Sequence, residues 1–475
     1  MAYEMVIGME VHVELKTESK VFCGCSTRFG SGPNTQTCPV CLGLPGSLPV
    51  LNKKALEHTI AVGIALDCTI SSFSKFDRKN YFYPDLPKNY QISQYDKPFA
   101  FEGKLPIVIN GKRKDIRIRR AHLEEDTGKL IHLDDGTSGI DYNRSGVPLL
   151  EIVTEPDMRS PQEAFEYLTR LKTLLEYLEV SDCNMEEGSM RCEANVSVRK
   201  EGEPLREYVE IKNVASISGV KRALEFEFER QVRIYEAGGT IHRETRRWNP
   251  EEQKTSPMRS KEAAHDYRYF PEPDLAPTVI SREWIEEIRK KLPELPFDKQ
   301  MRYMKELGLS EYDAGVLTAS RDIAEYYEKC IELSTNYKGV CNWLTQDILG
   351  YMNEHKIPVR DIKIKPEMLI SMMQMIDTGK ISGKIGKMLI EEMLANGGEP
   401  AKIVEEKGWV QISDESEIDR IVEQVLTANP DQIASYKSGK TKVVGWLVGQ
   451  IMKESKGKAN PQIVNKKLME RLGKM

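Results

Sequence analysis

Near the start of the chain, one stretch reads Met5-Val-Ile-Gly-Met-Glu-Val-His-Val-Glu-Leu15. From Met9 onward its residues alternate: apolar side chains share one face, whereas Glu10, His12 and Glu14 share the other. Successive side chains of a β-strand point to opposite faces. The pattern therefore predicts a strand with an apolar back and a front that carries chemically active groups.

The segments around this strand extend a region rich in strands and loops that covers the first 155 residues. Asn110-Gly111 predicts the turn of a hairpin that joins a strand over 104–109 to one over 115–121. Met190–Arg199 alternates as a further strand, and residues 207–212 resemble another.

Two helices are predicted beyond residue 155. Ser160-Pro-Gln-Glu163 has the form of a capping box with proline at the first helical position, and apolar residues follow it at helical spacing up to Leu178. A second helix carries Leu224, Phe228, Val232 and Tyr235 and ends at Gly238-Gly239.

From about Ser281 onward the pattern predicts helices only. They cover residues 281–292, 297–307, 310–333, 339–356 and 365–396, and Asn396-Gly-Gly-Glu-Pro400 has the composition of a linker. The fold class expected is α+β. We expect a β-rich domain with flanking helices over 1–292, a helical domain over 293–407 and a small helical tail domain over 408–475.

Composition excludes several classes of protein. The 475 residues carry 68 Lys and Arg against 73 Asp and Glu, a net charge of −5, so a polycation that binds nucleic acid by bulk charge is excluded. A hydrophobic fraction of 40% at this length excludes global disorder. The charge is nevertheless segregated: residues 401–435 carry 3 basic and 8 acidic groups, and residues 436–475 carry 10 basic and 2 acidic groups, a net +8.

Nothing in the sequence predicts secretion or a membrane span. The first residues have neither a basic nor a long apolar region, and the long uncharged stretch over 29–52 is interrupted by prolines. We therefore expect a cytoplasmic protein. Disulfides are rare in that compartment, so the clustered members of its nine cysteines are interpreted first as metal ligands.

Four cysteines form two close pairs. Cys23-Gly-Cys25 is followed after twelve residues by Cys38-Pro-Val-Cys41-Leu-Gly43. Two pairs of thiols are typical of a tetrahedral zinc site, although Cys-x-Cys is tighter than the usual Cys-x-x-Cys. No histidine or open position is evident, so a structural zinc is favoured over a catalytic one, and four free thiols are the alternative.

Acidic residues gather among glycine, proline and asparagine rather than on the open face of a helix. Glu10-x-His12 by itself is more often a structural hydrogen bond than a ligand pair. However, His122-Leu-Glu-Glu125-Asp, the stretch around Glu151, and Asn184-Met-Glu-Glu187 add carboxylates among Gly, Pro and Asn. Carboxylates are the ligands that Mg²⁺ takes in proteins, commonly together with substrate phosphates. The set suggests phosphoryl transfer.

The stretch from Phe76 to Gln94 interleaves aromatic residues, cations and amides. Such a loop can stack a base and neutralise a phosphate, but a proline-bounded loop with buried tyrosines is the simpler interpretation of that stretch alone. The Ser-Gly-Lys440-Thr segment lacks the first glycine of a P-loop, which is Ala434. No stretch typical of an amidase appears, so if ammonia is used, we expect another chain to make it.

Taken together, these strings resemble the B subunits of bacterial aspartyl/glutamyl-tRNA amidotransferases (GatB). The resemblance covers most of residues 5–275. It rests on long ungapped motifs: Gly8-Met-Glu-Val-His12, Asp77-Arg-Lys-Asn-Tyr-Phe-Tyr-Pro-Asp-Leu-Pro-Lys-Asn-Tyr-Gln91, His122-Leu-Glu-Glu-Asp126, Asn143-Arg-Ser-Gly-Val-Pro-Leu-Leu-Glu-Ile152, Met185-Glu-Glu-Gly-Ser-Met-Arg-Cys192, His242-Arg-Glu-Thr-Arg-Arg-Trp248 and His265-Asp-Tyr-Arg-Tyr-Phe-Pro-Glu-Pro-Asp274. It implies a cradle-shaped catalytic domain, a helical domain and a YqeY-like tail that binds tRNA.

The resemblance also implies an activity. ATP phosphorylates the side-chain carboxylate of misacylated Glu-tRNA(Gln) or Asp-tRNA(Asn). Ammonia channelled from the glutaminase, or amidase, of the complex (its A subunit) then displaces the phosphate, and a small C subunit completes a heterotrimer. The implied cofactors are ATP, Mg²⁺ (with Mn²⁺ as a substitute) and structural zinc.

Site residues follow from the same resemblance. The expected Mg²⁺ ligands are Glu10, His12, Glu124, Glu125 and Glu151. The expected catalytic residues are Lys79, Arg144, Glu187 and Arg191, and those expected to bind ATP are Lys79, Tyr81, Tyr83 and Arg191. The zinc ligands are Cys23, Cys25, Cys38 and Cys41.

Two alternatives remain on sequence grounds. One is a zinc-containing tRNA-binding scaffold without chemistry of its own, which leaves the convergent carboxylates unexplained. The other is an ATP-dependent ligase for a small molecule, which leaves the basic tail unexplained, because a +8 segment of about 40 residues is typical of a grip on a phosphate backbone.

Overall fold

The computed structural model describes residues 3–258, 267–410, 414–437, 440–455 and 458–474. Its fold is α+β, as predicted: a β-rich first part is followed by helices only. The chain divides into two compact units between Asp298 and Lys299. The expected domain boundaries at 293 and 408 stay predictions. No helix in the described ranges is long and apolar enough to cross a membrane.

The first unit is built on a sheet of nine strands in the order β14-β13-β12-β11-β1-β10-β7-β6-β2. The predicted strand at the start of the chain is β1, Tyr3–Glu14, at the centre of this sheet, where it pairs antiparallel with β10 and β11. The other strands of the sheet are β2 Thr69–Ile70, β6 Ala100–Ile109, β7 Lys112–Glu125, β10 Pro148–Thr154, β11 Met190–Lys200, β12 Val209–Lys212, β13 Glu244–Asn249 and β14 Lys254–Pro257.

Smaller sheets and loops flank the large sheet. The order β15-β4-β5 forms a three-stranded sheet that contacts β7 through β5. Its strands are β4 Asp77–Asn80, β5 Tyr90–Ser93 and β15 Phe270–Pro271. Two further pairs of strands are β3 Phe73–Ser74 with β16 Thr278–Val279, and β8 Lys129–His132 with β9 Ser138–Asp141. The three-stranded sheet, called the small sheet below, carries the predicted aromatic and cationic stretch in β4 and β5.

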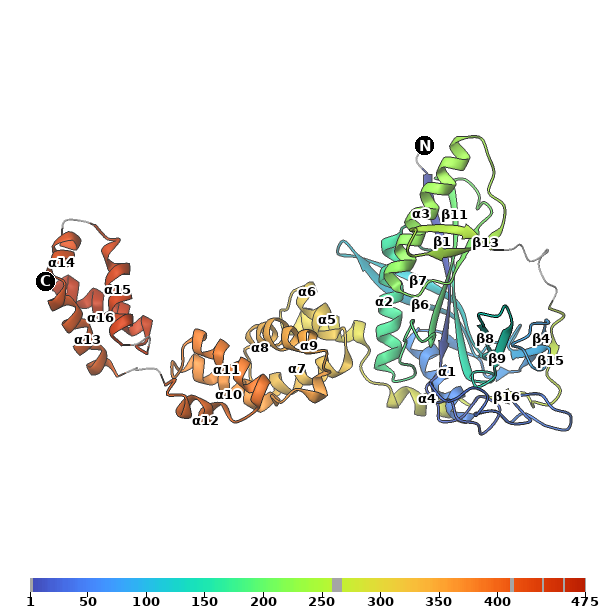
Figure 1. Ribbon diagram of the computed structural model, residues 1–475, viewed down its shortest axis with the longest axis horizontal. Coiled ribbons are helices and arrows are strands. Elements are labelled where there is room, and N and C mark those ends of the chain that lie inside the picture. Colours follow the sequence, from blue (N-terminus) through green and yellow to red (C-terminus); the bar gives the residue numbers. More distant parts are fainter. Residues whose placement is uncertain (1–2, 259–266, 411–413, 438–439, 456–457, 475) are drawn as a thin grey trace. The chain divides into compact units, whose positions relative to one another are not determined.

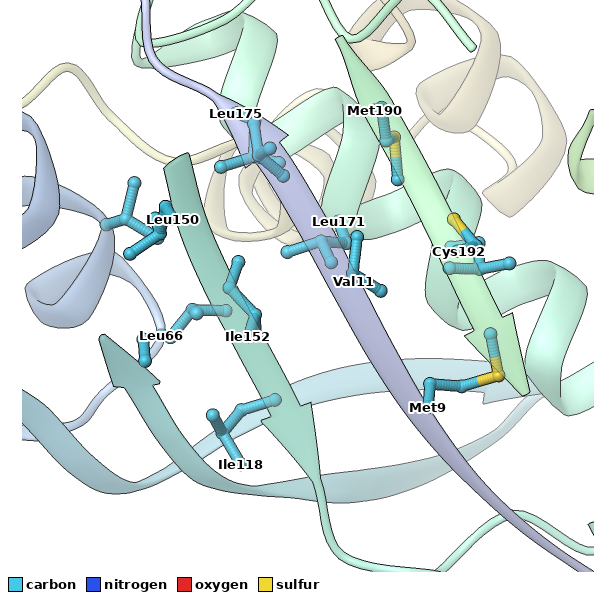
Figure 2. Close-up of a cluster of buried hydrophobic side chains, with 14 of the residues drawn as sticks. Met9, Val11, Leu66, Ile118, Leu150, Ile152, Leu171, Leu175, Met190 and Cys192 are labelled. Carbon is cyan, nitrogen blue, oxygen red and sulfur yellow. The ribbon is translucent and has the colours of Figure 1, made fainter. Parts of the chain in front are cut away.

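The alternation of apolar and polar side chains along β1 determines which face of the sheet is packed against the helices. Met9, Val11 and Val13 are buried, as predicted, and they pack with residues of the helices that cover this face. Figure 2 shows Met9 and Val11 in one buried cluster with Ile152 of β10 and Leu171 of α2. The covering helices are α1 Lys53–Ala65, α2 Pro161–Tyr177 and α3 Ile217–Glu236. The opposite face of the strands is left for polar side chains.

Local sequence signals explain how these elements begin and turn. The predicted hairpin joins β6 to β7, and both Asn110 and Gly111 have positive φ, as a two-residue turn between antiparallel strands requires. Ser160 caps α2 by accepting from the Glu163 N–H at 3.2 Å. The capping box is incomplete, because the Glu163 carboxylate accepts from the backbone N–H of Arg159 rather than from that of Ser160.

The rest of the chain is helical, with shorter helices than predicted. The expected helix over 310–333 is divided at Ala319 and Ser320, and that over 365–396 is divided between Thr378 and Ser382. The helices are α4 Arg282–Lys291, α5 Pro296–Glu306, α6 Glu311–Thr318, α7 Arg321–Leu333, α8 Tyr337–Trp343, α9 Leu349–His355, α10 Pro366–Asp377, α11 Gly383–Asn396 and α12 Pro400–Glu406, with a π-helical segment over Leu344–Ile348 between α8 and α9.

The last helices form a small bundle, which we call the tail bundle. It consists of α13 Glu415–Ala428, α14 Pro430–Lys437, α15 Val443–Glu454 and α16 Pro461–Lys474. Its buried residues, among them Val422, Leu447 and Leu468, form a hydrophobic core distinct from that of the preceding helices. In Figure 1 these helices are drawn in the orange-red end of the colour scale.

Candidate active site

A row of polar side chains crosses the face of the large sheet that lies opposite the helices α1, α2 and α3. Residues paired directly across antiparallel strands point to the same face. His12 of β1 is paired with Glu151 of β10 on one side and with Arg191 of β11 on the other, and Glu151 is paired in turn with His122 of β7. Four strands therefore bring His122, Glu151, His12 and Arg191 into one row.

Three of the predicted metal ligands meet at this row. His12 Nε2 lies 3.5 Å from Glu151 Oε2 and 4.0 Å from Glu124 Oε1. One ligand atom from each of the three residues lies within 4.8 Å of the others. Two carboxylates and an imidazole nitrogen at this spacing fit a divalent cation such as Mg²⁺ or Mn²⁺.

Electrostatics keep the two carboxylates ionised. Burial favours the neutral form of Glu151, but His122 and His12 outweigh it and hold the pKa of Glu151 well below its usual value. For Glu124, burial is likewise outweighed by His122 and Lys79, so its pKa is lowered. Burial would lower the pKa of His12, but the hydrogen bond and charge of Glu151 and the charge of Glu124 raise it to about 9. A divalent cation bound between Glu124 and Glu151 would supply the positive charge that His12 and His122 supply in its absence.

His122 is a neighbour of these ligands that was not among the predicted site residues. Its side chain is 2% exposed, and its Nε2 lies 3.2 Å from Glu151 Oε2 and 3.7 Å from Glu124 Oε2. Its Nδ1 is buried without a hydrogen-bond partner among the described residues. The one sequence signal that pointed to it was the spacing of His122 and Glu124 two residues apart on a strand.

Lys79 of β4 faces the same carboxylates from the small sheet. Its ammonium lies 5.0 Å from the ring centre of Tyr267 and 5.8 Å from that of Tyr81. Burial disfavours the charged form, yet the charges of Glu124 and Glu151 raise the pKa of Lys79, so it stays a cation. Tyr81 donates its hydroxyl to Gln91 at 3.2 Å, whereas Tyr83 is 41% exposed.

Two predicted ligands lie in other groups of side chains. Glu10 meets Glu193 and Glu210, accepts from Asn195 at 2.8 Å, and has Lys212 nearby, which pairs with both Glu193 and Glu210. The structure therefore does not bring Glu10 together with His12, Glu124 and Glu151.

Glu125 follows Glu124 on β7 and points the opposite way. It accepts from Lys88 at 2.6 Å and from the backbone N–H of Ile92 at 2.8 Å. Adjacent residues of a strand cannot both reach one site on one face, so only Glu124 of this pair joins the set with His12.

The predicted arginines meet at a buried acid that the sequence did not single out. Arg191 donates to Asp126 at 2.7 Å, and Arg144 lies 3.7 Å from the same carboxylate. Arg144 also donates to the carbonyl oxygens of Thr127 and Gly128. Glu187, in contrast, is exposed on the turn before β11 and does not join these groups.

The four predicted cysteines come together. One Sγ from each lies within 4.8 Å of the others, and the sulfurs of Cys38 and Cys41 are 3.9 Å apart. Sulfurs bound about 2.3 Å from a tetrahedral zinc lie about 3.8 Å from one another, so this set fits zinc. The amide N–H of Cys38 points at the sulfur of Cys41 at 3.1 Å.

A buried lysine adds positive charge beside these sulfurs. Lys20 is fully buried and its ammonium lies 3.6 Å from Cys41 Sγ. The hydrogen bond with Cys23, together with the charge of Lys20, lowers the pKa of Cys41 to about 4. A thiolate is the form that binds a metal, so the surroundings of Cys41 favour a metal site.

Comparison with known proteins gives consistent matches along the chain. Residues 5–286 match the model of the GatB/GatE catalytic domain, and residues 325–472 match that of the GatB domain. The chain is 55% identical over 475 residues to a protein of Thermoanaerobacter sp. (strain X514), which covers the whole of both chains. It is 53% identical over 480 residues to one of Carboxydothermus hydrogenoformans, covering 100% of this chain and 99% of the other.

A third relative, from Geotalea daltonii, is 53% identical over 477 residues, covering 99% of this chain and all of its own. Each of the three is named as the B subunit of an aspartyl/glutamyl-tRNA(Asn/Gln) amidotransferase. Because identity this high extends over both chains from end to end, the protein belongs to the GatB family, the B subunits of aspartyl/glutamyl-tRNA(Asn/Gln) amidotransferases.

Proposed function

We propose that this chain activates and amidates the side-chain carboxylate of Glu-tRNA(Gln) or Asp-tRNA(Asn), as the B subunit of an amidotransferase. It uses ATP and Mg²⁺, and it receives ammonia from a glutaminase, the A subunit, in a complex with a small C subunit. The observation that carries the proposal is the set of His12, Glu124 and Glu151 beside the Lys79 ammonium, on the face of the sheet opposite the helices.

The reaction needs two steps because a free carboxylate has no good leaving group. In the first, a side-chain carboxylate oxygen of the aminoacyl group attacks the γ-phosphorus of ATP, and the bond to the bridging oxygen breaks to release ADP. In the second, ammonia attacks the acyl carbon and the acyl–oxygen bond breaks. One ammonia proton leaves with the phosphate as hydrogen phosphate, and the product is the amide.

Residues of this chain have separate tasks in this scheme. Glu124 and Glu151, with His12, would hold Mg²⁺, which when bound neutralises phosphate charge and aligns the reacting groups. Lys79 stays cationic and is held between two tyrosine rings, so it offers a fixed positive charge to a phosphate or to the substrate carboxylate.

Two arginines would bind anions at the border of the site. Asp126 positions Arg191 and, at a longer distance, Arg144. The cysteine set would hold zinc in a structural role, because all four of its ligands come from the protein and it fixes the loop between Phe22 and Gly43.

The test is a coupled assay with the chain purified together with a co-expressed amidase. We expect conversion of Glu-tRNA(Gln) to Gln-tRNA(Gln) that depends on ATP and on glutamine. Ammonium chloride in place of glutamine should also support the conversion, which isolates the contribution of this chain. Absence of amide product with either nitrogen source would contradict the proposal.

A further inference from the structure

We propose that Lys20 is a positioning residue that joins the cysteine set to the turn that carries Arg144. Its ammonium would balance the charge of the zinc–thiolate centre and, at the same time, hold the backbone of that turn. The inference rests on the proposed function where it takes Arg144 as a group that binds an anion.

Lys20 is buried without an acidic partner. Its side chain is fully buried, and among the residues that the structure describes no carboxylate oxygen lies within 4.0 Å of its ammonium. The ammonium instead lies 3.6 Å from Cys41 Sγ and donates to the carbonyl oxygen of Tyr142 at 3.3 Å. A buried charge is costly unless an opposite charge accompanies it, so another negative group has to balance this lysine.

The cysteine set supplies that negative charge once it holds zinc. Four thiolates around one Zn²⁺ carry a net charge of about −2. The sulfur that the ammonium contacts belongs to Cys41, the one buried member of the set, so little water is available to stabilise the charge. Lys20 and a zinc-loaded centre therefore stabilise each other, whereas four neutral thiols would leave the lysine without a counter-ion.

The same lysine contacts both ends of the turn that carries Arg144. The carbonyl oxygen of Tyr142, to which Lys20 donates, also accepts from the backbone N–H of Ser145 at 3.0 Å and so closes the turn. At the other end, Cδ of Lys20 lies 3.5 Å from the position that a Cβ on Gly146 would take. The backbone N–H of Val21 donates to the carbonyl oxygen of Gly146 at 2.9 Å.

Arg144 depends on the position of this turn. Its guanidinium donates to the carbonyl oxygens of Thr127 and Gly128 at 3.0 and 2.7 Å, and it lies 3.7 Å from Asp126. These contacts require the backbone of Arg144 to stay in place, since the side chain reaches them from the turn. Lys20 is fully buried and holds that backbone, so it acts through Arg144 and does not touch a substrate.

The loop between the two cysteine pairs is attached to the same turn. Asn143 donates its side-chain amide to the carbonyl oxygen of Gly32 at 2.7 Å and accepts from the backbone N–H of Gln36 at 2.8 Å. Zinc ties the two ends of this loop together, so its loss would release the loop as well as the counter-charge of Lys20. Zinc, Lys20 and the turn are therefore expected to respond together.

The first test measures zinc retention, without any reaction, in the full chain purified with the amidase. Lys20→Met keeps an unbranched side chain but removes the charge. We expect zinc to pass to a chromogenic chelator about tenfold faster from this variant than from the wild type, as for the loss of other outer-shell partners of a metal. Lys16→Met changes an exposed lysine of the same segment and should release zinc at the wild-type rate. Lys20→Arg keeps the charge and should release zinc more slowly than K20M.

The second test follows the turn by hydrogen exchange, again without a reaction. The backbone N–H groups of Ser145, Gly146 and Val147 all donate within the protein, so they are protected while the turn is in place. K20M should exchange these amides at least about fivefold faster than the wild type, whereas K16M should not. Wild type stripped of zinc should show the same increase, and this comparison decides the matter if K20M does not fold.

The third test asks whether Lys20 acts through Arg144. In samples with a full complement of zinc, K20M and R144A should each lower kcat/KM for trapping the activated carboxyl with hydroxylamine by about tenfold. K20M/R144A should lie within about twofold of R144A, because the effects of residues that act through one another do not add. A merely structural lysine would cost the same factor with or without Arg144.

Each other outcome overturns the inference. Zinc release at the wild-type rate by K20M would show that Lys20 does not balance the centre, and equal release by K20R and K20M would assign the effect to packing. Unchanged exchange of the turn amides, or additive losses in K20M/R144A, would separate Lys20 from Arg144. If the wild type forms no activated carboxyl while the first two tests give the expected results, the proposed function fails and the hold of Lys20 on zinc and on the turn stands.

Discussion

His122 illustrates how a residue outside the ligand set can control it. Its ring nitrogen faces Glu151 at 3.2 Å and Glu124 at 3.7 Å, and a carboxylate can only accept, so the imidazole donates from Nε2. Outer-shell hydrogen bonds of this kind orient metal ligands. We interpret His122 as a positioning residue for the two carboxylates.

Two amide substitutions separate this role from simple packing. His122→Gln can place an N–H near the position of Nε2, whereas His122→Asn reaches only the position of Nδ1. We expect the Asn variant to bind Mn²⁺ about 10- to 100-fold more weakly than the wild type, with the Gln variant retaining most of the affinity. Calorimetric titration of the purified chain with Mn²⁺ measures this, and equal affinities for the two variants would refute the assignment.

The predicted zinc site can also be tested by substituting single cysteines. Cys41→Ser should reduce the zinc content from one ion per chain to nearly none and lower the free energy of unfolding by about 3 kcal/mol, because metal binding is lost and Lys20 is left buried beside a neutral group. Elemental analysis and denaturant unfolding provide the readouts. Cys68→Ser lies outside the set and should retain the zinc. A wild-type protein without zinc after metal-replete expression would refute the prediction.

At the scale of residues, the sequence predicted those parts of the site whose members lie close together in the chain. The four cysteines are close in sequence and meet as predicted. Glu124 and Glu125 could not be distinguished, because which of two neighbours faces the site depends on the register of β7 against β10. That register pairs residues far apart in the chain, as in the contact of His122 with Glu151, and one sequence does not specify it.

At the scale of elements, a charge cluster joins helices α5 and α7. Glu328 accepts from Lys299 at 2.8 Å and also from Arg302. Burial would raise the pKa of Glu328, but these two cations outweigh it and lower the pKa below its usual value of 4.5. A carboxyl whose pKa is lower in the folded than in the unfolded chain stabilises the fold above the unfolded pKa, and this contribution is lost as pH falls through the folded pKa.

The cluster therefore predicts a pH-dependent effect of one substitution. Glu328→Gln should lower the free energy of unfolding at pH 7 by about 1.5 kcal/mol, the size expected for a charged hydrogen bond. The difference from wild type should shrink as pH falls below about 4, where the carboxylate is protonated in both states. Urea unfolding at several pH values tests this, and a difference that is constant with pH would show that packing rather than charge is responsible.

Element positions were predicted better than element lengths. Alternation identified β1 and its buried face, and Asn110-Gly111 identified the hairpin, because each signal lies within a few residues. The breaks at Ser320 and near Thr378 were missed, since the apolar spacing continues on both sides of each break and only capping residues mark it.

At the scale of the whole molecule, acidic and basic residues that are separate in the sequence come together in the folded tail bundle. The sequence shows an acidic stretch followed by a basic one, from which we predicted that the basic segment over 436–475 grips the phosphate backbone of tRNA. In the tail bundle, Lys467 and Arg471 instead pair with acids of α13. The separation of acidic and basic residues along the sequence therefore does not predict which cations remain available to bind phosphate.

Deleting residues 408–475 tests the tail as a unit. In a complex with the amidase, we expect the apparent KM for misacylated tRNA to rise about tenfold and the salt dependence to flatten, because counterion release from phosphates is lost. Glutaminase activity measured without tRNA should stay unchanged. An unchanged KM and salt slope would assign the basic residues to solubility alone.

The central claim is that the carboxylate of tRNA-bound glutamate is phosphorylated at the site formed by His12, Glu124 and Glu151. The most direct measurement incubates the complex with Glu-tRNA(Gln) and ATP, without a nitrogen donor, and traps the activated carboxyl with hydroxylamine. The wild type should release ADP and form the hydroxamate in equal amounts. Glu151→Gln should bind tRNA with an unchanged Kd and form at least about 100-fold less hydroxamate. Glu155→Gln, which changes a carboxylate paired with Arg119 beyond the end of β10, should match the wild type. Hydroxamate formed by Glu151→Gln at the wild-type rate, or none formed by the wild type, would contradict the account.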